Sequence, residues 1–287
     1  MSDILMRQSI VSTVTKPTVV IQPAKGLLHV DLNGVWQYRE MLYFLIWREV
    51  KVRYKQTVLG AAWAILQPLM TMLIFTAVFG NFAKIPSDGS PYPVFSYAAL
   101  LPWTYFSEAI SRSGTSLVSD AHLIRKIYFP RLIMPLAAVV SPLVDFFPSF
   151  FLLLCMMEWF GIVPTQAMLA LPLFLFLALV TALSVGLWLS ALNVRYRDVR
   201  YTIPFLVQFW MYASPVVYPV SLVPDKWRLL YSLNPMVGVI EGFRWGLLGK
   251  QSPDLGTVTI SATAVIVLLI GGLFFFKRME RIFADVV

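Results

Sequence analysis

Charged residues inside long apolar stretches are the residues of this sequence that could do chemistry. Asp145 lies in the middle of the apolar stretch 132–157, next to Phe146 and Phe147. An ionised carboxylate is costly in an apolar environment, so it needs a partner or a function. Asp145 could relay protons, accept hydrogen bonds from sugar hydroxyls, or bond structurally to a neighbouring span. The structural bond is the simplest of these interpretations.

Two further carboxylates have a basic residue nearby in the sequence. Glu108 precedes Arg112 by four positions, a spacing that places both on one helix face and predicts a local ion pair. Glu241 precedes Arg244 by three positions. Two interpretations of this second pair stay open: an ion pair beside a gate, or two charges that solvate a helix in a wet vestibule.

Patterns typical of catalytic sites are absent from the sequence. The two histidines, His29 and His122, lie far apart, and no His, Cys or carboxylate cluster has metal-ligand spacing. The nucleophile pattern G-x-S-x-G does not occur. The nearest approach to a phosphate-binding loop, Gly249-Lys250, lacks the upstream glycine and the following Ser or Thr. We therefore expect no enzyme activity, no cofactor and no metal in this chain.

The composition indicates which kind of structure positions these residues. The chain has 287 residues, 58% hydrophobic and only 13% charged, and its mean hydropathy is +0.73. A soluble domain carries roughly a quarter charged residues, so the composition excludes a soluble enzyme and predicts an all-α polytopic membrane protein. The apolar stretches predict six transmembrane helices, at residues 62–82, 94–116, 132–157, 168–194, 202–220 and 257–276.

Two segments fit neither a span nor a loop, and they define the domain organisation. Residues 36–57 mix apolar and basic residues and predict an amphipathic helix at the membrane interface, although the alternation at 50–55 would also suit a strand. Its basic side would face anionic headgroups through Arg48, Lys51, Arg53 and Lys55. Residues 223–250 hold two short apolar stretches split by Asn234-Pro235, which predicts re-entrant half-helices. Residues 1–35 form an N-terminal extension, and 58–287 form the six-span domain.

Basic residues predict the orientation in the membrane. With six spans, 18 of the 23 Lys and Arg residues fall on the side of the two termini. Cytoplasmic loops carry the excess of basic residues, so we expect both termini in the cytoplasm. The net charge of +8 therefore reports topology, and no nucleic-acid partner is expected.

Aromatic residues are 15% of the chain and gather on two predicted spans. Aromatic faces can stack on sugar rings, and they also serve in ordinary lipid-facing packing. Both interpretations stay open for the following set: Trp63, Phe75 and Phe79 on the first span, and Phe205, Phe209, Trp210, Tyr212 and Tyr218 on the fifth span and its exit.

An ordered series of short motifs runs through most of the chain. The motifs are LIWREVKVRY at 45–54, TVLGAAW at 57–63, LLPW at 100–103, LIRKIYFPR at 123–131, NVRYRDV at 193–199, SPVVYP at 214–219 and NPM at 234–236. From about residue 36 to residue 280 the chain resembles the membrane subunit of ABC-2 type polysaccharide exporters, which move lipid-linked O-antigen, capsule or teichoic acid chains.

This resemblance implies a half-transporter in the bacterial inner membrane. Two copies of the chain would assemble with two copies of a separate ATPase, which holds the ATP and Mg²⁺, and would pass a lipid-linked polysaccharide outward. The first and fifth spans would line the channel, and the half-helices would gate its outer end through Asn234, Glu241 and Arg244. The ATPase would dock on the loop between spans 2 and 3, at Leu123, Ile124, Arg125, Lys126, Ile127, Tyr128, Phe129 and Arg131.

Three other functions compete with this one. An ABC-2 exporter of a drug or another lipid would share the same architecture. A membrane glycan or acyl transferase would need clustered acid, base or metal-binding residues at one membrane face. An ion-coupled transporter would show an internal repeat and essential buried carboxylates. We find neither a repeat nor such a cluster in the sequence, so the exporter is preferred.

Overall fold

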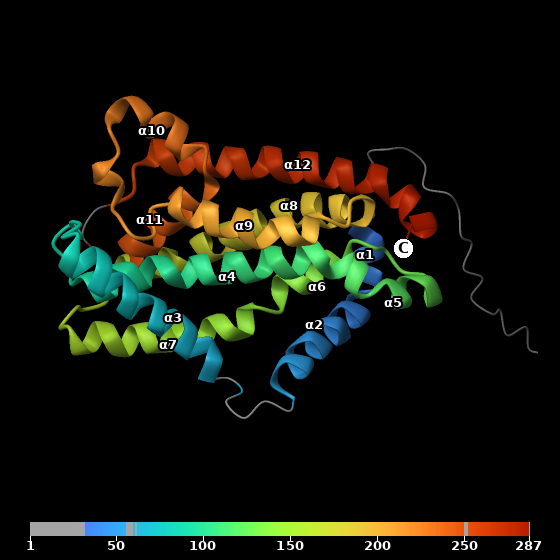
Figure 1. Cartoon of the computed structure of the whole chain (residues 1–287), viewed down its shortest axis with the longest axis horizontal. Coiled ribbons are helices and arrows are strands. Elements are labelled where there is room, and N and C mark those ends of the chain that lie inside the picture. Colours follow the sequence, from blue (N-terminus) through green and yellow to red (C-terminus); the bar gives the residue numbers. More distant parts are fainter. Residues whose placement is uncertain (1–31, 56–59, 61, 250–251, 287) are drawn as a thin grey trace, which may run out of the picture.

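The computed structural model describes residues 32–55, 60, 62–249 and 252–286. The N-terminal extension up to residue 31 and the predicted end of the interface helix at 56–57 lie outside this part. All regular secondary structure in the described residues is helical. The long helices run side by side in one elongated bundle (Figure 1).

The chain forms several long apolar helices, which shorter helical segments connect. In chain order they are α1 (Leu32–Gln37), α2 (Arg39–Tyr54), α3 (Ala62–Phe75), the π-helix η1 (Thr76–Phe82), α4 (Tyr92–Ser119), α5 (Ala121–Lys126), α6 (Ile133–Val140), α7 (Leu143–Trp159), the 3₁₀ helix η2 (Gln166–Ala170), α8 (Leu171–Arg195), α9 (Val199–Tyr212), the 3₁₀ helix η3 (Val220–Leu222), α10 (Asp225–Ser232), α11 (Pro235–Leu248) and α12 (Leu255–Val286).

Helix α4 forms the centre of the bundle, and α8 is its main neighbour. Small residues let these helices approach closely, as in other membrane bundles. A Cβ atom on Gly186 of α8 would lie 2.3 Å from the Ser113 hydroxyl oxygen of α4. A Cβ atom on Gly242 of α11 would lie 2.1 Å from the Phe174 ring of α8. Larger side chains at these two glycines would therefore push the helices apart.

Four helical stretches are long and apolar enough to cross a membrane: Ala62–Phe82, Ile133–Trp159, Gln166–Arg195 and Leu255–Glu280. They coincide with the first, third, fourth and sixth predicted spans. The third is interrupted at Ser141 and Pro142, where α6 ends and α7 begins. Helix α4, at the position of the second span, has 28 residues and reaches about 42 Å. It is less apolar, with several serines, Glu108 and Arg112.

The predicted fifth span is wrong as a continuous helix over residues 202–220. Helix α9 ends at Tyr212 and has only 14 residues, about 21 Å, which is shorter than the roughly 30 Å of hydrocarbon. Pro215 and Pro219 follow, and neither can donate a backbone hydrogen bond to continue the helix. The apolar residues after Tyr212 instead form a folded loop between α9 and η3.

The predicted break at Asn234-Pro235 is confirmed, because α10 ends at Ser232 and α11 begins at Pro235. Asn234 caps α11 by accepting a hydrogen bond from the Met236 backbone N–H at 3.1 Å. Helix α11 packs among α4, α8 and α12, and most of its residues are buried. Helix α10 lies outside, against α12, with Trp227, Leu229 and Leu230 exposed.

Different helices lie at the two ends of the bundle. Helices α1, α2 and α5 lie with the C-terminal end of α12 at one end of the bundle, and α10 and α11 lie at the opposite end (Figure 1). We name these the inner and outer ends after the orientation that the basic residues predict. A second hydrophobic cluster holds the inner end together. Its buried residues include Leu45 of α2, Phe129, Ile133 of α6 and Phe283 of α12.

Candidate functional site

A chain of ion pairs at the inner end joins α2 to α4 and to the start of α5. An Arg48 guanidinium nitrogen lies 2.6 Å from an Asp120 carboxylate oxygen and 3.0 Å from Glu49. Glu49 lies 3.8 Å from Arg112, which pairs with Glu108 at 2.5 Å. The predicted Glu108–Arg112 pair is therefore confirmed, and it is one link of a longer network. The side chains are about one-fifth to two-fifths exposed.

A second polar contact joins the end of α2 to α7. Asp145 makes an ion pair with Arg53 and accepts a hydrogen bond from the Tyr54 hydroxyl. Of the three roles considered for Asp145, the structure places it in a structural link. Its partners lie on α2, the predicted interface helix, and not on a neighbouring span. Because both charged side chains are mostly buried, removing one partner leaves the other uncompensated.

The four basic residues predicted to face headgroups divide into two pairs. Arg48 and Arg53 are engaged in the ion pairs just described, and their contact with headgroups stays a prediction. Lys51 near the end of α2 and Lys55 just after it are exposed. The exposed aromatic side chains of the inner helices, Trp36, Tyr43, Phe44 and Trp47, suit a helix that lies in the membrane interface.

The segment predicted to dock an ATPase also divides between an exposed and a buried part. Arg125, Lys126, Ile127 and Tyr128 are exposed, and Tyr128 has 70% of its surface accessible. Leu123 and Ile124 pack against the inner hydrophobic cluster.

Two residues of the predicted docking set are used inside the chain. Phe129 is only 5% exposed because it packs in the inner cluster. Arg131 donates to the Glu280 backbone carbonyl and stacks on the Phe283 ring. In this conformation both residues anchor the loop to α12, and their contact with an ATPase stays a prediction.

At the outer end, Arg244 and Asn234 fix the loop that follows α9. Arg244 is buried, donates to the carbonyls of Val216 at 2.9 Å and Tyr218 at 3.2 Å, and stacks on the Phe95 ring at 3.6 Å. It forms no ion pair with Glu241 in the described part of the chain, so the ion-pair interpretation is not supported, whereas both side chains line a polar cavity, as the solvated interpretation expects. Asn234 donates to the Ala213 carbonyl at 3.1 Å and the Ser214 hydroxyl at 2.9 Å.

An aromatic groove lies between α9 and α10. It encloses about 490 Å³ and is lined by Leu206, Phe209, Trp210, Ala213, Trp227, Leu230, Tyr231 and Asn234. Polar groups of its aromatic residues are satisfied within the chain: the Trp210 indole N–H donates to Asn234 at 2.9 Å, and the Tyr231 hydroxyl donates to Tyr218 at 3.0 Å. The groove therefore presents flat, largely apolar faces.

The other predicted channel residues are scattered. Phe205 and Tyr212 are exposed on α9, and Tyr218 bonds to the Tyr212 carbonyl at 3.1 Å. Trp63 is exposed and lines a separate cavity near Arg53 and Asp145. Phe75 is 7% exposed and packs edge-on against Phe79. Phe75 is therefore a core residue in this conformation, and its contact with a passing sugar stays a prediction.

Sequence reasoning missed several residues that the fold brings to these sites. Glu49 and Asp120 complete the inner ion-pair network, and Trp227 and Tyr231 supply the α10 wall of the aromatic groove. Asp120 lies 72 positions from Arg48, so no local spacing could have shown the pair. The aromatic residues of α10 carried a weak signal, because they lie on one amphipathic turn just before Asn234.

A comparison with protein families assigns this architecture. A family model described as ABC-2 type transporter matches residues 40–248, from the second residue of α2 to the end of α11. The chain belongs to the ABC-2 type transporter family. Within this ABC-2 transporter chain, the match covers the inner ion-pair network, the exposed part of the α5 segment and the aromatic groove.

Individual relatives extend this ABC-2 match over most of the chain. The O-antigen export system permease protein RfbA of Myxococcus xanthus is 31% identical over 259 residues, 88% of this chain and 98% of that protein. The protein of the same name in Klebsiella pneumoniae is 24% identical over 86% of this chain and 95% of its own. The polysialic acid transport protein KpsM of Escherichia coli is 23% identical over 83% of this chain and 92% of its own.

Proposed function

We propose that this chain is the membrane-spanning subunit of an ATP-driven exporter that moves a lipid-linked, O-antigen-like polysaccharide outward across the bacterial inner membrane. The observation that carries the proposal is the similarity to two O-antigen export permeases along nearly their whole length. Full-length similarity supports a shared architecture for the passage itself, whereas a short match would support one element only.

The proposed unit is a homodimer that works with two copies of a separate ATPase. One chain leaves many apolar residues of α3 and α9 exposed, among them Leu73, Ile74, Phe205 and Phe209. Two copies related by a two-fold axis can form a passage between such surfaces, which a single bundle filled by α4 cannot. The aromatic groove of α9 and α10 would lie along this passage in its outer half.

The ATPase docks, in this proposal, on the exposed part of the α5 segment. Ile127 and Tyr128 supply apolar contact, and Arg125 and Lys126 supply charges at the rim that fix the orientation. Movement of α5 reaches α2 through the Arg48–Asp120 pair. The Arg53–Asp145 pair then carries it to α7.

The lipid carrier approaches beside α2 at the cytoplasmic surface. Lys51 near the end of α2 and Lys55 just after it are exposed and supply positive charge for the phosphate groups. Both termini lie on the cytoplasmic side in this arrangement. The arrangement has six membrane crossings. Four are the apolar stretches named above, one is α4, and one is α9 together with the loop after it.

An ATP hydrolysis assay on purified, reconstituted proteins tests whether the separate ATPase, and not this chain, hydrolyses ATP. We expect no turnover by this chain alone and clear turnover when it is reconstituted with its co-encoded ATPase. Turnover by the isolated chain would contradict the proposal. Reporter fusions at the two termini test the orientation, and a signal from opposite faces of the membrane would contradict an even number of crossings.

A further inference from the structure

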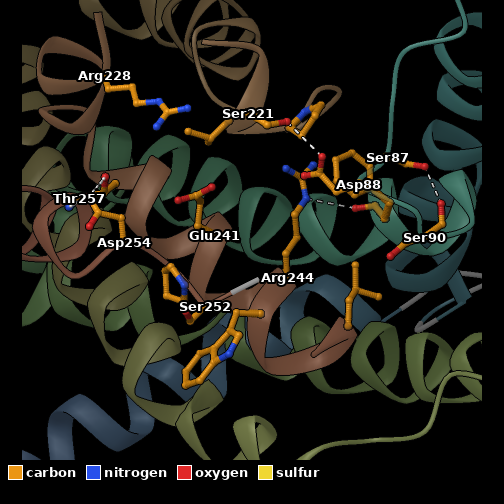
Figure 2. Close-up of a pocket in the computed structure, with 16 residues that line it drawn as sticks. Ser87, Asp88, Ser90, Ser221, Arg228, Glu241, Arg244, Ser252, Asp254 and Thr257 are labelled. Carbon is orange, nitrogen blue, oxygen red and sulfur yellow. Dashed lines mark hydrogen bonds between the residues drawn. The ribbon is translucent and has the colours of Figure 1, made fainter. Parts of the chain in front are cut away.

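A polar cavity at the outer end is not used by the function proposed above. It holds about 230 Å³ between α11, α12 and the loops before α4 and after α9. Glu241 and Arg244 lie at its centre, and Asp88, Ser221, Arg228 and Asp254 surround them (Figure 2). Its volume equals that of roughly eight waters at about 30 Å³ each. It is smaller than the roughly 300–1,000 Å³ of sites that enclose drug-sized ligands, so it fits about one sugar-sized ring.

The positive charges of the cavity are already engaged. Arg244 directs its guanidinium to the carbonyls of Val216 and Tyr218, as described above. Arg228 pairs with Asp225 at 3.1 Å. An anion that entered the cavity would therefore meet guanidinium groups that already donate hydrogen bonds within the chain.

The carboxylates are only partly engaged. Asp254 accepts from the Thr257 and Gly256 backbone N–H groups at the start of α12, which hold the pKa of this carboxyl below its usual range. Asp88 accepts one hydrogen bond, from the Ser221 hydroxyl at 3.1 Å. The half-buried Glu241 has no hydrogen bond or ion pair within the described residues, although it faces the cavity (Figure 2).

These features select a class of ligand. A half-buried carboxylate without a partner needs donors, since an unmade hydrogen bond to a charged group is costly. The three carboxylates outnumber the two guanidinium groups, so negative ligands are repelled. In the described part of the chain, no group of three or more His, Cys, Asp or Glu is arranged to hold a metal. Phe95 and Trp245 give the cavity an apolar wall, and sugar rings combine hydroxyl donors with an apolar face.

We propose that this outer cavity binds one ring of the exported glycan, and that it selects rings bearing hydroxyl or amino groups over rings bearing carboxylates. The inference rests on the proposed function, because it names the class of sugar that the exporter accepts at its exit. It places Glu241 as the hydrogen-bond acceptor for the ring and the Phe95–Arg244 stack as part of the floor.

Protection of a single cysteine tests this inference. Cys155 is replaced by Ala, and Ser252, an exposed residue on the wall of the cavity, is replaced by Cys. The assembled exporter in lipid nanodiscs is labelled with a bulky maleimide while one of three probes is present: maltohexaose, a chitosan hexamer or hexagalacturonate. For a Kd of about 1 mM, about 10 mM of maltohexaose or chitosan hexamer slows labelling about tenfold. Hexagalacturonate leaves the rate unchanged.

Two matched controls separate this site from general effects. Cysteine at Gln166, an exposed position at the start of η2 and outside the cavity, should label at the same rate with every probe. Glu241→Gln should remove most of the protection, whereas Glu158→Gln, at an exposed carboxylate near the end of α7, should keep it.

Three results would overturn the inference: no protection by any probe, equal protection by hexagalacturonate, or equal protection in the two Gln variants. Any of them in an exporter that still transports glycan would leave the proposed function standing.

Discussion

Arg48 of α2 and Asp120 at the start of α5 lie 72 positions apart in the sequence, yet their side chains are 2.6 Å apart. This contact joins the helix proposed to guide the lipid carrier to the segment proposed to dock the ATPase. Both side chains keep some exposure, so the pair contributes only about 0–1 kcal/mol to stability. Its importance would therefore lie in transmitting movement.

Breaking the Arg48–Asp120 pair should uncouple ATP hydrolysis from export. We expect Asp120→Asn to leave the ATPase bound and active but to lower glycan export per ATP severalfold. The charge-swapped double variant, Arg48→Asp with Asp120→Arg, should restore most of the coupling, because the attraction is re-formed. The measurement is the ratio of exported glycan to phosphate released in proteoliposomes. Equal ratios in wild type and Asp120→Asn would show that movement does not pass through this pair.

Asp145→Asn should destabilise the attachment of α2 to α7. The substitution keeps the side-chain shape but leaves Arg53 without its counter-charge, so we expect a loss of about 1.5–3 kcal/mol in the free energy of unfolding. Denaturant titration in detergent measures this loss. In an Arg53→Met background, Asp145→Asn should lower the free energy of unfolding much less, since no charge is left unpaired. A similar loss in both backgrounds would show that Asp145 acts through another partner.

Neighbouring aromatic residues after α5 should give opposite results. Tyr128→Ala, at an exposed position, should reduce co-purification of the ATPase while leaving the stability of the chain unchanged. Phe129→Ala removes a buried ring and should lower stability by about 3–5 kcal/mol. Thermal unfolding of the chain alone, beside quantitative pull-down of the ATPase, distinguishes the two. Normal ATPase binding by Tyr128→Ala would exclude this docking surface.

Arg244 should not be replaceable by lysine. Its planar guanidinium donates to more than one carbonyl of the loop after α9 and stacks on Phe95, and a lysine cannot reproduce that geometry. We expect Arg244→Lys to lower the melting temperature of the chain, whereas Arg228→Lys, at an exposed position, should have little effect. Limited proteolysis within residues 213–219 should also become faster in Arg244→Lys. Equal stability of the two variants would contradict this anchoring role.

The aromatic groove should affect export more than ATP hydrolysis. Trp227→Ala removes a large flat surface from its α10 wall, so long glycans should move more slowly, while Trp227→Phe should keep most of the rate. Export rates for glycans of two lengths, measured beside ATPase activity, test this. Unchanged export by Trp227→Ala would remove the groove from the path.

Local patterns in the sequence predicted those parts of the fold that depend on neighbouring residues. The four-residue spacing of Glu108 and Arg112 was sufficient for their ion pair, and Asn234-Pro235 was sufficient for the break between α10 and α11. Hydropathy located four long apolar helices and also α4, but it extended the fifth span past Pro215, because an average over a window gives no weight to lost backbone donors.

Which residues come together in each site depends on tertiary packing, and the spacing of residues along the sequence does not show this packing. Tyr128 and Phe129 are adjacent and chemically alike, yet only one is buried, because the loop turns back onto α12 at Arg131. Arg244 has a carboxylate three residues away, but its burial directs it to backbone carbonyls instead. The burial and the partners of such residues depend on contacts between segments that are far apart in the sequence.

The most direct test of the central claim is glycan movement driven by a partner's ATP hydrolysis. Inside-out membrane vesicles containing this chain, its co-encoded ATPase and a labelled lipid-linked glycan are supplied with ATP, and the fraction of glycan protected from an added glycan-degrading enzyme is followed. We expect protection to rise with time only when both proteins and hydrolysable ATP are present. Protection without the ATPase, or its absence while the complex hydrolyses ATP, would contradict the central claim.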